Sequence, residues 1–333
     1  MAKEKEIAIS GIQASGNLHI GNYIGAIKQF VELQDQYDMY AFVADLHAIT
    51  VPQEPDKLRK NTLDAVYLYL ACGLDSAKTT IFVQSHVPTH TELGWILNTL
   101  TPMGELERMT QFKEKSNKEG SLAGLFNYPT LMAADILLYG PDVVPVGEDQ
   151  IQHIELTRTL ARKFNSRFGE TFKEPKDLVQ KEGARIMGLD DPAKKMSKSA
   201  ASKNNYIGIL DSEDEIRQKI KIAVTDSGKE IKYDPATKPA VSNLLVIMSQ
   251  MSNEPLKDLE EKFAGKNYGE FKNMLADILV QKLSPIRKKY NELANEPESV
   301  LKILQKGAKK ALGKSEATMK IVRQKIGLLM NID

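Results

Sequence analysis

The chain has 333 residues, of which 42% are hydrophobic, and a formal net charge of only +1. This length exceeds a typical single domain, so we expect a large domain with a smaller second one. No uninterrupted apolar run reaches about 18 residues, and the charged start leads only to a short apolar stretch, so we expect no membrane span and no export signal. Cys72 is the single cysteine, so we expect no internal disulfide and a reducing, cytoplasmic setting.

The first elements predict a strand, a loop and a helix. Residues 7–12 form a short apolar run typical of a buried strand, and apolar residues recur at helical spacing after His19, at Ile20, Ile24, Ile27 and Val31. The intervening loop therefore leads to a helix N-terminus, which attracts phosphate. Gly11, Gly16 and Gly21 let adenine or phosphate approach the backbone, and His19 can donate hydrogen bonds to phosphate. Helix packing by Gly21 and capping by His19 are the alternatives.

Further strands are predicted at residues 40–44, 80–84 and 143–146, and they alternate with helical patterns at 63–70 and 156–168. Gly73 is the expected C-terminal cap of the first of these helices. Alternation of this kind predicts a doubly wound α/β fold with a parallel sheet. His47 follows the strand at 40–44, where open α/β sheets bind ligands, so it is a candidate for substrate contact or a locally packed loop histidine.

Two features lie in residues 86–100. His86 and His90 are four residues apart, as two zinc ligands on a helix would be, but Pro88 argues against a helix there and no third ligand is nearby. We therefore predict no metal site. The segment 93–100 is apolar around much of a helix, which fits either a subunit interface or deep burial.

The stretch KMSKS at residues 195–199, the lysine loop, places two ammonium groups three residues apart. A turn signal precedes it at 190–192 and a polar run follows at 202–205, so we predict a loop. Lysine suits phosphate oxygens whose charge moves during a reaction, because its ammonium is compact and its stem flexible. Taken alone, a solvated charge run is the alternative.

After the lysine loop the helical patterns dominate, from about residue 211 to 290, with a break at 232–235, and predict a helical second domain. Residues 301–333 contain eight Lys or Arg and two acidic residues, a net charge of +6, which fits a polyanionic partner or a solvated helix face. The nearby Gly307 to Ser315 is no phosphate-binding P-loop, because five residues separate its glycines where that motif has four.

The turn at residues 19–22 and the lysine loop resemble the two signatures of class I aminoacyl-tRNA synthetases. Stretches at 10–13, 45–50, 104–113, 132–137 and 146–150 are similar to bacterial tryptophanyl-tRNA synthetases, in the family's order and over nearly the whole chain. The chain departs from the family pattern at Ile9, Ala14 and Ala200, which are often Phe, Pro and Asp, and at His19, which is often Thr in bacterial members.

The resemblance implies a Rossmann-like catalytic domain at residues 1–188, a helical anticodon-binding domain at 189–291, and C-terminal helices from about 292 to 333 that pack back on the first domain. It implies a cytoplasmic homodimer, with the segment 93–100 near the subunit contact, that activates L-tryptophan with ATP and then acylates tryptophan tRNA. Mg²⁺ would accompany ATP without a protein metal site.

Carried over residue by residue, the resemblance assigns a catalytic role at the phosphates to Lys195, Lys198, Lys115 and His19. The implied ATP-binding positions are Gly11, Gln13, Gly21, Asn22, Gly147, Asp149, Ile186 and Met196. The implied tryptophan-binding positions are Asp135, Tyr128, Met132, Ile136, His47, Val144, Val146 and Gln150.

Asp135 also stands out from chemistry alone, because it is a carboxylate inside the apolar run 131–138 and needs a partner there. Indole has one donor, its ring N–H, and no acceptor, so a single carboxylate oxygen can recognise it. A capping or buried ion-paired aspartate is the alternative.

Three other functions are weighed against tryptophan activation: a tyrosine-specific synthetase, a nucleotidylyltransferase with a similar histidine-glycine turn, and a non-catalytic RNA-binding relative. The lysine loop and the helical domain weigh against the second, and two intact signatures weigh against the third. We expect no editing domain, because tryptophan is the largest side chain and one pocket can reject smaller competitors.

Overall fold

The computed structural model describes residues 5–14, 18–113, 122–179, 186–198, 200 and 202–329, without the side chains of Ile12 and Gln13. Among these residues, five parallel strands form one sheet in the order β3-β2-β1-β4-β5. The strands are β1 (Ile7–Gln13), β2 (Asp38–Ala44), β3 (Thr79–Val83), β4 (Val143–Val146) and β5 (Lys176–Val179). The Rossmann-like, doubly wound parallel sheet that the sequence predicts is confirmed.

The chain divides into two compact units. Unit 1 comprises residues 1–16, 30–179 and 296–333, and unit 2 comprises residues 17–29 and 180–295. Residues 17–29 group with the later segment because their backbone is bonded to it: the Ile20 N–H donates to the Ile207 carbonyl at 2.9 Å and the Ile209 N–H donates to the Leu18 carbonyl at 3.0 Å. The catalytic and anticodon-binding roles expected for the two parts remain predictions.

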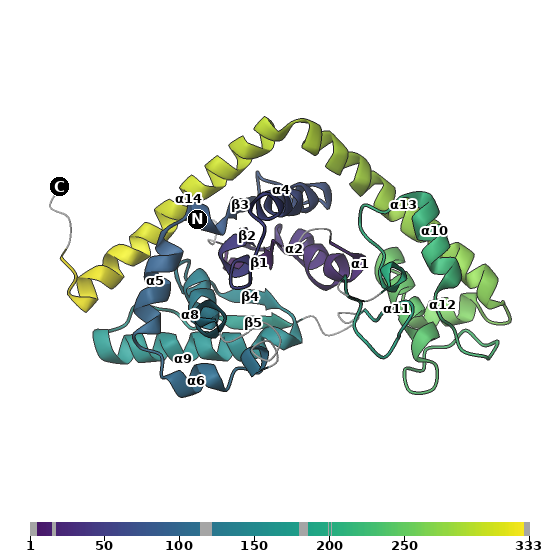
Figure 1. Cartoon of the computed structure of the whole chain (residues 1–333), viewed down its shortest axis with the longest axis horizontal. Helices are drawn as coiled ribbons and strands as arrows, with labels where there is room; N and C mark the ends of the chain where they lie inside the picture. The colour runs from purple at the N-terminus through teal and green to yellow at the C-terminus, as the bar shows by residue number, and fades with distance from the viewer. Residues whose placement is uncertain are drawn as a thin grey trace. The chain divides into compact units, whose positions relative to one another are not determined.

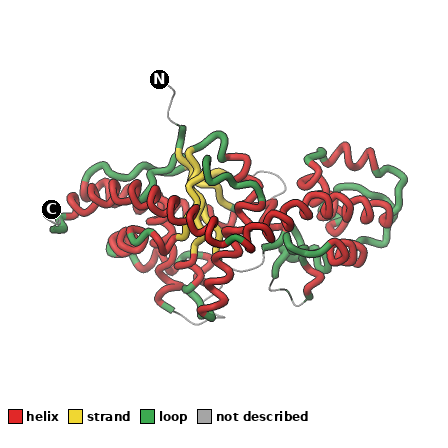
Figure 2. The backbone as a smooth tube through the Cα atoms, turned by 90° about the horizontal axis from the view of Figure 1, so that it is seen from above, coloured by secondary structure: helices red, strands yellow, loops and turns green. Residues whose placement is uncertain are grey.

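Unit 1 holds the sheet and covers both of its faces with helices (Figures 1 and 2). Its helical elements are α3 (Asp45–Ala48), α4 (Pro55–Ala71), η2 (Gln84–His86), α5 (Thr89–Asn98), α6 (Met103–Glu107), α8 (Ala123–Leu137), η3 (Glu148–Gln150), α9 (Ile151–Phe168) and α14 (Pro297–Ile326). The predicted glycine cap of α4 is present, since Gly73 adopts φ +108°.

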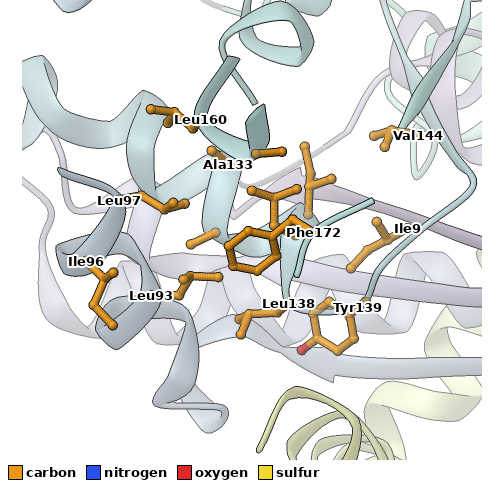
Figure 3. Packing of buried hydrophobic residues seen from close by; sticks show 14 of the residues in the cluster. Ile9, Leu93, Ile96, Leu97, Ala133, Leu138, Tyr139, Val144, Leu160 and Phe172 are labelled. Carbon is orange, nitrogen blue, oxygen red and sulfur yellow. The ribbon is translucent and has the colours of Figure 1, made fainter. Parts of the chain in front are cut away.

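The main hydrophobic cluster of unit 1 lies between the sheet and the helices α5, α8 and α9 (Figure 3). Ile9, Phe82 and Val144 contribute from the strands, and Leu97 and Leu160 from the helices. This close-packed core makes unit 1 rigid, and so fixes the positions of polar side chains at the carboxyl edge of the sheet.

Helix α14 packs along the edge strand β3 and on α5. Thr318 donates to the Leu138 carbonyl at 2.8 Å, Arg323 donates to Glu92 at 2.7 Å and Lys310 contacts Asp38 at 3.1 Å. Part of the basic charge of the C-terminal segment is therefore neutralised within unit 1. Other lysines of the helix are exposed: Lys302, Lys306, Lys309, Lys314 and Lys320.

Gly307 is where α14 approaches β3 most closely, because a Cβ built there would overlap the carbonyl oxygen of Ile81. Gly307→Ala is expected to lower the free energy of unfolding by about 3 kcal/mol through overpacking against backbone that cannot rotate away. Gly313, on the same helix with no atom near its Cβ position, is the matched control, and Gly313→Ala should stabilise by up to about 1 kcal/mol. Equal shifts of both thermal midpoints would contradict this packing.

Unit 2 is helical in its described part. It contains α1 (Ile20–Asn22), the π-helical turn η1 (Tyr23–Ile27), the start of α2 (Lys28–Leu33), η4 (Lys203–Asn205), α10 (Glu213–Ile222), α11 (Pro239–Ser252), α12 (Leu256–Lys262) and α13 (Tyr268–Asn295). The helical segment and its break at 232–235, both predicted from sequence, agree with the gap between α10 and α11.

Several strand boundaries differ from the sequence prediction by one or two residues, and one strand is not predicted. Strand β2 starts two residues earlier, at Asp38, because it follows β1 in register from Ile7 onward. Gln84 belongs to the turn η2 and not to β3, because β3 ends at Val83, opposite Val43 of β2. The edge strand β5 was missed, since its four residues KDLV lack an apolar run and are at most half-buried.

Candidate functional site

The candidate-site residues of unit 1 lie at the carboxyl edge of the sheet. Strands β2 and β4 lie on opposite sides of β1, which makes this edge the switch point where open α/β sheets bind ligands. Strand β2 leads into α3 with His47, β3 leads into η2 with Gln84, and β4 leads to Gly147 and η3. Helix α8 brings Asp135 to the same place.

Asp135 is 1% exposed and accepts three hydrogen bonds. His47 Nε2 lies 2.7 Å from Oδ2, while Gln84 Nε2 and His90 Nδ1 lie 2.7 and 2.6 Å from Oδ1. Burial alone would raise the pKa of this carboxyl, but the attraction of His47 and the hydrogen bonds from His47 and His90 outweigh it and lower the pKa to about 2. The group is therefore an ionised acceptor at neutral pH.

A carboxylate has about four acceptor positions, so three bonds leave one on Oδ2. Asp135 thus has the buried polar partners of the alternative reading and still keeps capacity for one ligand donor. Its recognition of indole N–H stays a prediction. The sequence does not indicate the roles of Gln84 and His90 here, because a glutamine at a strand end belongs to no motif and the spacing of His90 from His86 suggests only a metal ligand. His86, its supposed partner, is exposed in η2.

Tyr128 is the second polar centre. Its hydroxyl lies 2.7 Å from His153 Nε2 and 3.1 Å from Gln111 Oε1, and its ring meets the His47 ring edge-on with centroids 6.0 Å apart. Burial, helped by Asp149, raises the pKa of Tyr128, so it remains a phenol. The structure therefore brings Tyr128, His47 and Asp135 together within unit 1.

The apolar positions predicted to surround tryptophan lie on α8 and β4. Ile136 and Val144 are buried in the hydrophobic cluster, and Met132 and Val146 are half-buried against it. Gln150 donates to Asp149 at 2.9 Å. Gly147 precedes η3 close to Asp149, and Gly11 lies on β1 with its backbone exposed. Lys115 and Gly16 lie outside the described residues, as does the side chain of Gln13.

Unit 2 contains the histidine-glycine turn and the lysine loop. His19 bridges to Gly208, and its N–H donates to Asn22 Oδ1 at 3.0 Å. Gly21 packs against the His19 ring, since an added Cβ would come within 2.9 Å of Nδ1. This packing of Gly21 is compatible with its predicted role in binding ATP. Ile186 is buried beside this turn.

The lysine loop is anchored by its backbone. Met196 is buried and its N–H donates to the Ile186 carbonyl at 2.9 Å, while the Ser197 N–H donates to Asn205 Oδ1 at 2.9 Å. Lys195 and Lys198 are exposed on either side of these anchors. An anchored backbone with exposed ammonium groups is the arrangement that a phosphate-binding loop requires.

The charges of Lys195 and Lys198 affect the pKa of His19. Burial, followed by the positive charges of Lys195 and Lys198, lowers its pKa from 6.5 to about 4. The unfolded chain therefore binds a proton that the folded chain excludes between these values, and stability falls as the pH drops from about 6.5 to about 4. Between pH 7 and pH 5, the free energy of unfolding of the His19→Gln variant should fall by up to about 2 kcal/mol less than that of the unsubstituted chain. Urea unfolding at the two pH values is the measurement, and parallel losses would contradict the assigned charge state.

An apolar pocket of about 420 Å³ lies in unit 1 between α3, α5 and α8. Trp95, 69% exposed, and Ile49, 56% exposed, line it together with Gly94, Tyr128 and Leu131. On α5, Leu93 and Leu97 are fully buried whereas Trp95 is not, so the helix has one face in the core and one apolar side chain outside it.

No helix in the described ranges has an apolar stretch long enough to cross a membrane. In comparisons with known proteins, residues 1–284 match the family model of class I tRNA synthetases for tryptophan and tyrosine. The chain is 53% identical over 322 residues to a tryptophan–tRNA ligase of Caldanaerobacter subterraneus subsp. tengcongensis, covering 96% of this chain and 98% of that protein. It is 51% identical over 325 residues to that of Bacillus subtilis, covering 97% and 98%.

Solved structures agree with these relatives. A tryptophanyl-tRNA synthetase from Mycoplasma pneumoniae is similar at a TM-score of 0.91 and 39% identity, covering 98% of both chains. One from Campylobacter jejuni, complexed with ADP and tryptophan, is similar at a TM-score of 0.83 and 40% identity, covering 97% of this chain and all of that one.

Proposed function

The chain belongs to the class I tRNA synthetases for tryptophan and tyrosine, and we propose that it activates L-tryptophan with ATP and transfers it to tryptophan tRNA. It is a tryptophan–tRNA ligase and binds ATP. The observation that carries this function is about 50% identity, over nearly the full length, to tryptophan–tRNA ligases. The family match also removes the nucleotidylyltransferase alternative.

In the first step a carboxylate oxygen of tryptophan attacks the α-phosphorus of ATP, and the bond to the departing pyrophosphate breaks. In the second, a ribose hydroxyl of the tRNA attacks the tryptophanyl carbonyl and AMP leaves. Neither step needs a protein nucleophile, so we assign catalysis to orientation and charge stabilisation.

In unit 1 we assign Asp135 to the indole N–H and Tyr128 and Gln150 to the polar end of tryptophan. His47 supports Asp135 through the bond to Oδ2. The apolar contacts come from Met132, Ile136, Val144 and Val146. Gly11, Gln13, Gly147 and Asp149 would contact ATP.

In unit 2 we assign His19, Lys195 and Lys198 to the phosphates, and the assignment of Lys115 rests on sequence. The ATP-binding positions assigned next to these residues in unit 2 are Gly21, Asn22, Ile186 and Met196. His19 is neutral at pH 7, since its pKa is about 4, and can donate one hydrogen bond without adding to the charge of the lysines. We propose that Mg²⁺ arrives with ATP, held by phosphate oxygens and water, which is how this ion commonly binds.

Charging of tRNA tests the function as a whole. The purified chain should esterify tryptophan, and not tyrosine, to tryptophan tRNA in the presence of ATP. A transcript with the tyrosine anticodon is the control for tRNA selection by the helical unit. Charging of tyrosine instead would replace the proposal by the tyrosine-specific alternative.

We also propose that the enzyme is a cytoplasmic homodimer whose contact includes the pocket around Trp95. An exposed tryptophan beside an apolar pocket is typical of an interface. Sedimentation equilibrium should give about twice the chain mass of 37.2 kDa. Trp95→Asp should shift the mass towards one chain, whereas an unchanged mass would place the contact elsewhere.

A further inference from the structure

His90 contacts Asp135 from the apolar core of unit 1 and is not itself assigned to substrate. It is fully buried in α5, and its ring nitrogens contact two different groups: Nδ1 lies 2.6 Å from Asp135 Oδ1 and Nε2 lies 2.8 Å from the Tyr139 hydroxyl. The rings of Phe42, Phe82 and Tyr139 surround it at centroid distances of 5.9, 6.0 and 5.6 Å. Tyr139 itself sits in the hydrophobic cluster (Figure 3).

The hydrogen positions in this chain of contacts follow from the chemistry of its ends. An ionised carboxylate can only accept, so His90 Nδ1 carries a proton. In a neutral imidazole Nε2 is then bare and accepts from the Tyr139 hydroxyl. Burial raises the pKa of Tyr139, so this hydroxyl keeps its proton. Among the described residues His90 is its hydrogen-bond partner, so a doubly protonated His90 would leave the buried tyrosine proton without an acceptor.

Gln84 holds the same oxygen of Asp135, and its orientation is also determined. Its Oε1 accepts the Leu46 N–H at 3.2 Å, so its amide Nε2–H must point the other way, to Asp135 Oδ1 at 2.7 Å. Gln84 is fully buried. Oδ1 is therefore saturated by two buried donors, and the remaining acceptor position of the carboxylate lies on Oδ2.

We propose that His90, oriented by Tyr139 and assisted by Gln84, is a positioning residue that aims Oδ2 of Asp135 at the indole N–H and so sets selectivity for tryptophan. This inference rests on the proposed function, because it concerns the same pocket. The two donors prevent the carboxylate from rotating, and they oppose its protonation in an apolar site. The hydrogen bond of the Tyr139 hydroxyl goes to His90, so its effect on the orientation of Asp135 passes through that ring.

The test compares tryptophan with an analogue in which sulfur replaces the ring N–H, using kcat/KM in ATP/pyrophosphate exchange with the full chain. A defect that merely loosens the pocket lowers activity on both amino acids, whereas misdirection of the acceptor lowers activity on tryptophan alone. Tyr139→Phe should reduce the preference for tryptophan about three-fold to ten-fold, the effect of one neutral hydrogen bond. The KM for ATP should not change.

A double-mutant cycle separates the hydrogen-bond chain from simple packing. His90→Asn keeps a donor near the position of Nδ1 but cannot reach Tyr139, so it should retain more preference than His90→Leu, which has no donor. In the His90→Asn background, Tyr139→Phe should have no further effect on the preference, because the connecting ring is gone. His86→Asn, at the exposed histidine four residues away, is the matched control and should leave the preference unchanged.

Three results would overturn the inference: an unchanged preference in Tyr139→Phe, equal losses on both amino acids, or the same Tyr139→Phe effect in both backgrounds. Thermal melting of each variant identifies any that fails to fold, and the Tyr139→Phe comparison then decides, since it removes only a hydroxyl. If the unsubstituted enzyme does not distinguish tryptophan from the sulfur analogue, the assignment of Asp135 fails instead. If it does not activate tryptophan, the proposed function fails.

Discussion

Replacing Lys195 or Lys198 by alanine is expected to slow tryptophanyl-adenylate formation by about 100-fold to 1,000-fold, the usual effect of losing one preorganised electrostatic contact. Tryptophan affinity should change little, because both lysines are assigned to the phosphates of ATP and not to the amino acid. Arginine should restore little activity, since its planar fork differs in shape from an ammonium. Single-turnover adenylate formation and tryptophan binding are the two measurements.

Lys194 supplies the matched control for these variants. It is adjacent in sequence, but its Nζ is paired with Asp191 Oδ2 at 2.9 Å on the surface. Lys194→Ala should therefore leave adenylate formation nearly unchanged, because an exposed ion pair contributes little. Equal losses of rate and tryptophan affinity in Lys195→Ala would show that the loop shapes the protein and does not act on phosphates.

Asp135→Asn is expected to lower kcat/KM for tryptophan by about ten-fold to 150-fold, the effect of losing a hydrogen bond to a charged group. The amide has nearly the same shape, but its NH₂ must face either His47 on one side or Gln84 and His90 on the other, all of which donate. The variant should also melt at a lower temperature for this reason. The KM for ATP should stay constant.

Phenylalanine activation distinguishes the two roles of Asp135. If Asp135 recognises the indole N–H, replacing it should lower the preference for tryptophan over phenylalanine. If Asp135→Asn melts lower but keeps that preference, the carboxylate serves only to hold His47, Gln84 and His90, and another group recognises indole.

The fold was predictable because its signals are local. Strands β2 and β4 are largely apolar and mostly buried, and α4 ends at a glycine with positive φ. Strand β5 carried no such signal, because an edge strand of four half-buried residues is stabilised by pairing with β4 and not by its own pattern. The grouping of residues 17–29 with unit 2 depends on backbone bonds to residues 207 and 209, which no local pattern encodes.

The site was predictable only where chemistry or family resemblance marked single residues. Asp135 stood out as a charge in an apolar helix, and His47 as a polar residue after a strand. Gln84 and His90 reach Asp135 from 51 and 45 residues away in the chain, so their roles depend on the packing of η2 and α5 against α8. Long-range convergence of this kind is invisible to sequence periodicity.

Amino-acid-dependent ATP/pyrophosphate exchange is the most direct measurement of the central claim that this chain activates tryptophan. With tryptophan, labelled pyrophosphate should enter ATP without any tRNA, and with tyrosine the rate should stay at the level without amino acid. Exchange that depends on tyrosine, or exchange with neither amino acid from correctly folded protein, would contradict the account.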